Sequence, residues 1–246
     1  MKIDLFLTAG TLTKADVKGK AVVIIDVLRS STSICAALEN GAKGIIPVDG
    51  PGQAGEIWTK IGPDTAILAG ERDGVKIENF SLGNSPGEFT AEAVAEKLVI
   101  MSTTNGTPIF EKAASAKLVL ACGLVNIGTV VDRLVETGLD LVIVCSGRNG
   151  GFSIEDTLCG GMIIDLLERQ HEVTSKLNDA ASLARLLYRS NQENVHDTIA
   201  SGEHGQYLQE IGFEADLETA SRVDSIDVLP VLTEGRLVNM NDAEGR

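Results

Sequence analysis

Short, continuously apolar runs alternate with segments of helical periodicity over the first 170 residues of the chain. Runs such as "AVVIID" and "LVIVC" lack the alternation of a half-exposed strand, and they are typical of strands covered on both faces. They predict strands at residues 21–26, 44–48, 66–70, 97–103, 117–122 and 139–147. The segments between them predict helices near residues 31–40, 51–60, 86–96, 107–115, 124–137 and 155–170.

This alternation predicts an α/β fold of three αβα layers around a mixed, mostly parallel sheet. After residue 170 the pattern changes to two helices with polar faces, at 176–190 and 196–211, followed by "SIDVLPVLTEGRLV" at 225–238. Gly235 indicates a turn between two edge strands there, and Pro230 favours an edge position. Since no linker is visible, we expect a single domain over 1–246 whose C-terminal third, about 171–240, packs on the sheet.

Composition narrows the possible partners and compartments. The 246 residues are 43% hydrophobic, and the net charge of −14 without any Lys/Arg-rich run argues against nucleic acid as a partner. Neither a secretory-type N-terminus nor an apolar run of about 18 residues is present, so we expect a cytoplasmic protein with no membrane partner. Cys35, Cys122, Cys145 and Cys159 lack C-x-x-C spacing, which favours buried, reduced thiols over zinc ligands or disulfides.

The loops that follow the predicted strands carry most of the polar chemistry. In a parallel sheet these loops emerge at one edge, where open α/β folds bind ligands. They read "DVLRSST", "GERDG" with "LGNSP", "STTNG" and "CSGRNGGFSIED". They bring together arginines and acids among many Ser, Thr, Asn and Gly residues: Arg29, Arg72, Arg148, Asp26, Glu71, Asp73, Glu155 and Asp156.

Such loops suit an anion and a cation together. Backbone N–H groups at helix starts, hydroxyl and amide donors and arginine forks bind phosphate or carboxylate oxygens. The neighbouring carboxylates would repel a phosphate unless a cation lies between them, and oxygen ligands suit Mg²⁺, so we hypothesise a Mg²⁺–phosphate site. Each residue also has a purely structural interpretation. Asp26, Thr103 and Thr104 are possible helix caps, Asn105-Gly106 a turn, and Glu155 an acid favoured by a helix dipole.

Several common phosphate motifs are absent. The chain contains neither a G-x-x-x-x-G-K-[ST] P-loop nor a G-x-G-x-x-G dinucleotide motif after a strand. Gly151 stands where a Cys145-x₅-Arg phosphatase loop needs arginine, and Asp26 lacks the second aspartate of a D-x-D phosphatase.

Taken in order, "DVLRSSTS", "GERDG", "LGNSP", "TTNGT", "SGRNGGFSIEDTLCGG" and "HGQYLQEIGFEADL" resemble the 2-phosphosulfolactate phosphatase family, the Mg²⁺-dependent phosphatases of coenzyme M biosynthesis. The resemblance extends from about Asp26 to Leu232, with departures at Ser30-Ser31, Glu78-Asn79-Phe80 and Gly160. It implies hydrolysis of (R)-2-phospho-3-sulfolactate to 3-sulfolactate and phosphate. The phosphate, carboxylate and sulfonate of that substrate give a reason for three loop arginines.

On this basis we assign candidate roles. Asp26, Glu71 and Asp156 are the candidate Mg²⁺ ligands, and His204 is a candidate proton donor to the leaving alkoxide or else an exposed or capping histidine. Either Asp26 or a water molecule bound to the metal attacks the phosphorus. The catalytic candidates are Asp26, Arg29, Arg72, Arg148 and His204. The substrate-binding candidates are Asn84, Ser85, Thr103, Thr104, Asn105, Gly106 and Ser153.

Two alternatives stay open at this point. In the first, the chain is a Mg²⁺-dependent phosphatase for another small phosphorylated hydroxy acid. In the second, it is a module that binds a phosphorylated metabolite without turning it over. We also expect a homodimer, because an apolar edge segment around "VLPVL" would need a cover.

Overall fold

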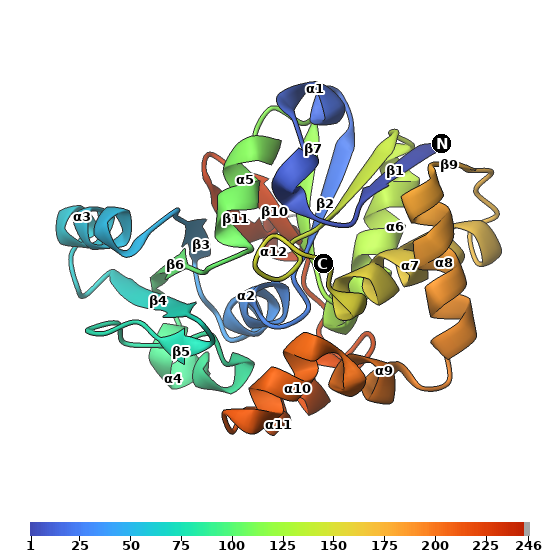
Figure 1. Ribbon diagram of the computed structural model, residues 1–246. Coiled ribbons are helices and arrows are strands. Elements are labelled where there is room, and N and C mark those ends of the chain that lie inside the picture. Colours follow the sequence, from blue (N-terminus) through green and yellow to red (C-terminus); the bar gives the residue numbers. More distant parts are fainter. Residues whose placement is uncertain (244–246) are drawn as a thin grey trace.

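The structure is a computed structural model that describes residues 1–243, and a mixed sheet runs through its centre (Figure 1). Over these residues the sheet has 11 strands in the order β5-β4-β6-β3-β11-β10-β7-β2-β8-β1-β9. The strands are β1 Lys2–Phe6, β2 Ala21–Ile25, β3 Gly44–Pro47, β4 Ala66–Arg72, β5 Val75–Lys76, β6 Leu98–Ser102, β7 Leu118–Cys122, β8 Leu141–Cys145, β9 Lys176–Leu177, β10 Pro230–Thr233 and β11 Arg236–Asn239.

The sheet consists of two parallel groups joined by the C-terminal hairpin. β2 pairs in parallel with β7 and β8, while β3, β6 and β4 form the second parallel group. Antiparallel β10 and β11 lie between the groups, where Val231 pairs with Leu120 of β7 and Leu237 pairs with Ile45 of β3. The prediction of two edge strands was therefore wrong, although the turn at Gly235 is confirmed.

Pro230 is compatible with the interior position because it is the first residue of β10, where no ladder donor is required of it. The hairpin buries Val231 and Leu237 inside the sheet instead of exposing them at an edge. The expected homodimer thus loses its sequence-based reason, and the oligomeric state stays a prediction.

Helices cover both faces of the sheet, so the α/β class and the layered sandwich are confirmed. On β2, Val23 and Ile25 pack into a core with α6 and α7, while Val22 and Ile24 pack into a second core with α2 and α5. Continuous apolar runs follow from this two-sided burial. The helices are α1 Lys14–Val17, α2 Ser30–Glu39, α3 Pro51–Ile61, α4 Ala91–Val94, α5 Thr107–Ala113, α6 Ile127–Thr137, α7 Ile154–Arg169, α8 Asp179–Asn191, α9 Val195–Ser201, α10 Glu203–Glu210, α11 Glu214–Ala220 and α12 Met240–Ala243.

Some elements differ from the predicted ones. β1, β5, β9, α1, α11 and α12 were missed, and the helix expected at 86–96 is a 3₁₀ turn at Pro86–Glu88 followed by the short α4. The helix expected at 196–211 is divided at Gly202, whose backbone is extended. A side chain at Gly202 would lie 2.6 Å from Ile154 Cγ2, so glycine permits the close approach of α10 to the start of α7.

The C-terminal helices α9 to α11, residues 195–220, lie across the edge of the sheet to which the ends of β2 and β8 point (Figure 1). Ile199, Leu208 and Leu217 pack in the same core as Val23 of β2. No helix within residues 1–243 is long and apolar enough to cross a membrane.

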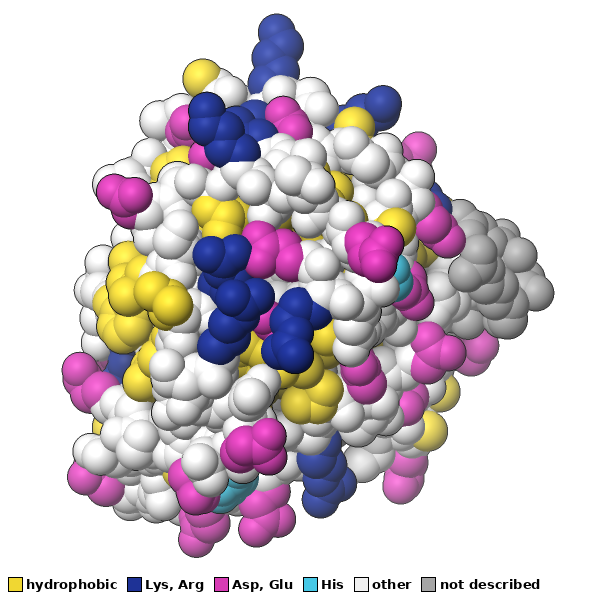
Figure 2. All heavy atoms as spheres, turned by 90° about the vertical axis from the view of Figure 1, so that its right-hand side faces the viewer, with side chains coloured by type: hydrophobic (Ala, Val, Ile, Leu, Met, Phe, Trp, Pro, Cys, Tyr) yellow, Lys and Arg dark blue, Asp and Glu magenta, His cyan; other side chains and the backbone are white. Residues whose placement is uncertain are grey.

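The face on the side of α8 gathers Lys and Arg side chains next to acidic ones (Figure 2). The ion pairs of α7 and α8 include Arg185 with Glu168 and Arg189 with Asp165. The arginines of α8 are therefore paired with acids of α7.

Candidate active site

A pocket of about 230 Å³ lies between the strand-end loops and helix α10. Many of the residues predicted from separate loops line it together: Asp26, Arg29, Glu71, Asn84, Thr104, Asn105, Arg148 and His204. Asp73, which the sequence grouped with these acids, also lines it, and the structure adds residues from the same loops and from α10: Leu28, Ser30, Gly74, Asn149 and Tyr207. The carboxyl ends of β2, β4, β6 and β8 and one C-terminal helix thus build a single site.

Asp26 is a buried carboxylate at the end of β2, with 6% of its surface exposed. The Ser30 backbone N–H donates to its Oδ1 over 3.2 Å. Burial raises the pKa of Asp26, while the Ser30 hydrogen bond and the neighbouring His204 act against this shift. A cation beside this carboxylate would favour its ionised form.

Glu71 joins two of the loops through its carboxylate. Its Oε1 accepts the Thr104 N–H at 2.7 Å, and its Oε2 accepts the Gly74 N–H at 2.8 Å. Each carboxylate oxygen has a further lone pair, so these bonds leave Glu71 able to bind a cation in the pocket.

Asp156, in the first turn of α7, is placed differently from Asp26 and Glu71 because it does not line the pocket. The Val27 N–H donates to its Oδ1 at 2.9 Å, while the Ser146 hydroxyl and the Gly147 N–H donate to its Oδ2 at 3.0 Å. Burial raises the pKa of Asp156 well above its usual range, and these bonds tie the loop after β2 to the loop after β8.

The structure brings only two of the three predicted Mg²⁺ ligands, Asp26 and Glu71, into the pocket. Within residues 1–243, no group of three or more His, Cys, Asp or Glu side chains is arranged to hold a metal ion. Asp26 and Glu71 nevertheless line one pocket with Asn84, whose buried Oδ1 accepts no hydrogen bond from the described residues. Mg²⁺ is commonly bound through one or two carboxylates plus substrate phosphate and water, and these side chains fit that mode of binding.

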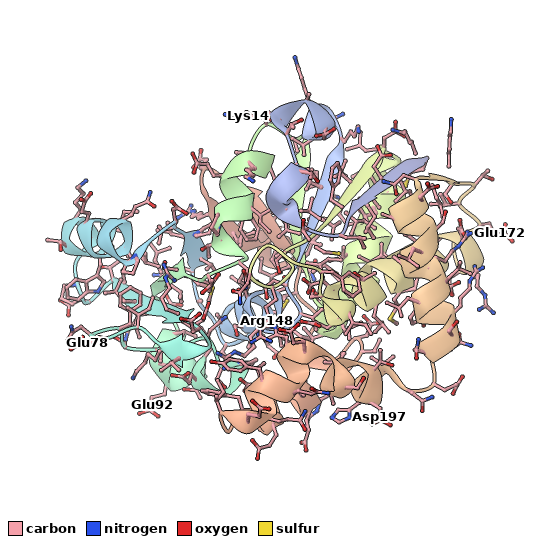
Figure 3. The ribbon with its side chains drawn as sticks, in the orientation of Figure 1. Lys14, Glu78, Glu92, Arg148, Glu172 and Asp197 are labelled. Atoms are coloured by element: carbon pink, nitrogen blue, oxygen red, sulfur yellow. The ribbon has the colours of Figure 1, made fainter. Side chains whose placement is uncertain are left out.

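The three predicted arginines have different surroundings. Arg29 pairs with Asp216, and Arg148 lies over the Tyr207 ring, 4.5 Å from its centroid, in the centre of Figure 3. The Arg148 Nη1 also donates to the Glu203 backbone oxygen at 3.0 Å. Arg72 lies outside the pocket lining and donates to the Glu71 and Ser102 carbonyl oxygens and to the Ser102 hydroxyl.

His204 lies in the first turn of α10 and lines the pocket, with 15% of its side chain exposed. Its Nδ1 is 3.2 Å from Oε1 of Glu155, whose side chain is 2% exposed. A carboxylate at Nδ1 favours the tautomer with a proton there and orients the ring, which leaves Nε2 for another partner.

The cysteines do not supply a nucleophile. All four are free and buried, as the sequence predicted. Burial raises the pKa of the Cys145 thiol, at the end of β8, well above its usual range. The thiol therefore stays protonated and unreactive at neutral pH.

Comparisons with known proteins agree with this site chemistry. The sequence profile of the 2-phosphosulpholactate phosphatase family matches residues 6–235. The chain belongs to this family. Curated relatives, each named a probable 2-phosphosulfolactate phosphatase, include proteins of Carboxydothermus hydrogenoformans (40% identical, 97% of each chain covered), Caldanaerobacter subterraneus subsp. tengcongensis (37%, 96% of this chain and 97% of the relative) and Clostridium acetobutylicum (37%, 97% and 100%).

Within this member of the 2-phosphosulfolactate phosphatase family, the predicted substrate-binding residues divide into two groups. Asn84, Thr104 and Asn105 line the pocket. The others lie outside its lining: Ser85, Thr103, Gly106 and Ser153. The Thr103 hydroxyl accepts from the Ser30 hydroxyl and from the N–H of Thr107, the first residue of α5, so in this structure it holds the start of that helix. Ser153 lines an adjoining cavity shared with Arg148 and His204.

Gly106 contributes through its lack of a side chain. A Cβ atom there would lie 2.5 Å from Oδ2 of Asp26 and 3.0 Å from the Ser30 hydroxyl. Glycine therefore allows the start of α5 to approach the buried carboxylate.

Several residues of the C-terminal helices contribute to the site but were not predicted from the sequence. The Tyr207 hydroxyl donates to the Asp73 carbonyl oxygen at 2.8 Å, and its ring supports Arg148. Phe213 and Asp216 of the next turn and helix contact Arg29. All lie in the family-like stretch "HGQYLQEIGFEADL", which was the available signal for them.

Proposed function

We propose that this chain is a Mg²⁺-dependent phosphatase that hydrolyses (R)-2-phospho-3-sulfolactate to 3-sulfolactate and phosphate. The observation that carries the proposal is the pocket in which Asp26, Glu71, Arg148 and His204 meet. Family membership over residues 6–235 and the names of the relatives support the phosphomonoester as substrate. A place in coenzyme M biosynthesis remains a prediction from the same resemblance.

The charges in the pocket support the need for a cation. Asp26, Glu71 and Asp73 line it with Arg29 and Arg148, and the charge of Arg29 is already offset by buried Asp216. A substrate with phosphate, carboxylate and sulfonate would add further negative charge to a site that has an excess of it. A Mg²⁺ ion held by Asp26 and Glu71 would bind the phosphoryl oxygens and offset the charge that develops on them.

The arginines and polar groups of the chain would bind and orient the substrate. Arg148 is held by stacking on Tyr207, so its guanidinium can receive an anionic group without losing much side-chain freedom. The wall of the pocket also contains the Asn84 and Asn105 amides, which can hydrogen-bond to the substrate. Together these contacts would fix the ester for attack on phosphorus.

His204 would supply the proton that the leaving group needs. The bond between phosphorus and the ester oxygen on C2 breaks, a new P–O bond forms to the attacking oxygen, and the departing alkoxide takes the Nε2 proton of doubly protonated His204. If water attacks, its proton passes to a carboxylate of the pocket; if Asp26 attacks, water then hydrolyses the phosphoaspartate to release phosphate. Glu155 at Nδ1 orients the ring for this transfer. The attacking oxygen belongs either to Asp26 or to water, and single-turnover ¹⁸O labelling of the enzyme's carboxylates distinguishes the two.

The test is phosphate release from phosphosulfolactate, measured with Mg²⁺ and with excess EDTA, beside phospholactate as the control that lacks the sulfonate. The proposal expects release only with Mg²⁺ and mainly from the sulfonate ester. Equal turnover of both esters would indicate a phosphatase of a different hydroxy acid. Tight binding without release from either ester would indicate the non-catalytic module and overturn the proposal.

A further inference from the structure

Arg29 is held by contacts from two distant parts of the chain. Its Nη1 donates to Asp216 Oδ2 at 2.9 Å, and its Nη2 donates to the Gly74 carbonyl oxygen at 2.6 Å. The guanidinium also lies over the Phe213 ring, 4.4 Å from the ring centroid. With 2% of its side chain exposed, Arg29 has one fixed orientation at the wall of the pocket.

Asp216 is itself fixed by a second partner. It lies on α11 with 5% of its surface exposed, and its Oδ1 accepts the Ser85 hydroxyl at 2.6 Å. Asp216 therefore uses one oxygen for Arg29 and the other for Ser85. The chain of contacts Ser85 to Asp216 to Arg29 connects the loop after β5, helix α11 and the loop after β2.

Stability alone does not explain this pair. Removing two charges from water is unfavourable, and replacing a buried ion pair by packed apolar side chains is often neutral or stabilising. Asp216 and Ser85 lie outside the pocket lining, whereas Arg29 lies within it. The acid thus contacts the arginine from outside the pocket lining.

We propose that Asp216 is a positioning residue that orients Arg29 for the anionic substrate, and that Ser85 acts through Asp216 instead of on the phosphate. A guanidinium has five N–H donors, and the contacts with Asp216 and Gly74 leave others for substrate oxygens. Helix α11 thereby sets the direction of a substrate-binding group that belongs to the loop after β2. This inference rests on the proposed function for its substrate, but its geometry can be tested separately.

The test compares Asp216→Asn with Glu218→Gln, which makes the same chemical change at an exposed position of α11. Asp216→Asn should lower kcat/KM for phosphosulfolactate about 100-fold, since misplacement of a binding group by about 1 Å has that effect. Glu218→Gln should leave it unchanged. Ser85→Ala, which removes only the hydroxyl, should give a loss of a few fold and remains informative if Asp216→Asn fails to fold.

A double-mutant cycle separates positioning from a structural role. In the Arg29→Gln background, Asp216→Asn should cause little further loss, because the group it orients is already absent. The same cycle is repeated on the dissociation constant of 3-sulfolactate, measured by calorimetry, with thermal melting as the folding check. An equal loss in both backgrounds, or an Asp216→Asn variant that behaves like Glu218→Gln, would overturn the inference.

The two proposals fail in different ways. If the wild-type protein releases no phosphate, and Asp216→Asn binds 3-sulfolactate more weakly than wild type, the proposed function is overturned and the positioning role is supported. Normal release and binding in a folded Asp216→Asn variant would overturn the positioning role alone. Wild-type protein that neither binds 3-sulfolactate nor releases phosphate would overturn both.

Discussion

The two halves of the site are held in place in different ways. The strand-end half comprises the loops at residues 26–30, 71–74, 103–106 and 146–156, and the helical half comprises residues 202–216. In the strand-end half, carboxylates accept backbone N–H groups within their own loop and from neighbouring strand-end loops, as Glu71 does from Gly74 and from Thr104. In the helical half, side chains reach across the fold, and Asp216 bonds to Arg29 at a separation of 187 positions.

This difference suggests a division of labour. The strand-end half supplies the candidate metal ligands, and its hydrogen bonds join loops that the strands already bring to one edge of the sheet. The helical half supplies His204 and Tyr207 and directs Arg29 and Arg148, so its contribution depends on how the helices dock. Substitution of a reacting group, Asp26 in the first half or His204 in the second, should remove chemistry, while substitution of a residue that supports such a group should degrade geometry.

The largest effect is expected for Asp26→Asn in the strand-end half. Loss of this carboxylate should reduce kcat for phosphosulfolactate on the order of 10³-fold or more, as for the loss of a central catalytic group. Phosphate release measured under saturating Mg²⁺ checks this. A loss below tenfold would contradict the assigned role.

The same variant should become more stable. Because burial raises the pKa of Asp26 in the folded protein, folding favours its protonated form, and the stability it contributes is lost as pH rises through the folded pKa. The Asp26→Asn variant has no carboxylate to ionise in the folded state. Its Tm in EDTA should therefore exceed that of wild type, and the difference should grow as pH rises from the unfolded-state pKa of Asp26 to its higher folded-state pKa. Equal Tm values throughout would contradict the sign.

The next effect is expected for His204→Asn in the helical half, and it should depend on the leaving group. Loss of a general acid should slow hydrolysis of the alkyl ester phosphosulfolactate by about 10²-fold. An aryl ester such as 4-nitrophenyl phosphate has a good leaving group and should be affected by no more than a few fold. Equal losses on both esters would show that His204 acts in some way other than proton donation.

A smaller effect is expected for Gly106→Ala, which brings a methyl group against Asp26 Oδ2. The displaced carboxylate should lower kcat/KM by about 10- to 100-fold. Gly87→Ala is the matched control, because the nearest atom to its added Cβ is the Ser85 hydroxyl at 3.9 Å. Activity and Tm of both variants are compared with wild type, and identical behaviour would exclude a close contact at Gly106.

The smallest effect is expected for Tyr207→Phe, which keeps the ring beneath Arg148 and removes only the hydrogen bond to Asp73. A neutral hydrogen bond contributes about 1 kcal/mol, so the loss in kcat/KM should be a few fold. Tyr188→Phe, at the other tyrosine of the chain, serves as the control and should have no effect. A loss above about 100-fold would mean that the Tyr207 hydroxyl contacts the substrate.

The sequence predicted the strand-end half more fully than the helical half. Asp26, Glu71 and Arg148 were located because a buried apolar run followed by polar residues marks the carboxyl end of a strand. Arg72 and Asp156 were grouped with them by the same rule, yet their side chains point to backbone groups outside the pocket lining. Position in a loop is visible in a sequence, whereas the direction of a side chain depends on the partners it meets.

Two further features of the structure could not be predicted from the order of residues along the chain. "VLPVL" was expected to form an edge strand, but β10 and β11 lie in the middle of the sheet, where they pair with β7 and β3. Asp216 is one acid among many along the C-terminal helices, and only its approach to Arg29 distinguishes it.

The sequence by itself determined the α/β class, the two-faced burial of the central strands and the loops that carry the acids and arginines, because these follow from periodicity and local chain direction. Tertiary structure alone decided the strand order, the closure of the pocket by α10 and the pairing of Arg29 with Asp216. Those features depend on contacts between residues far apart in the chain. Such contacts form only when the packing of the two cores brings the segments together, and no short stretch of sequence encodes them.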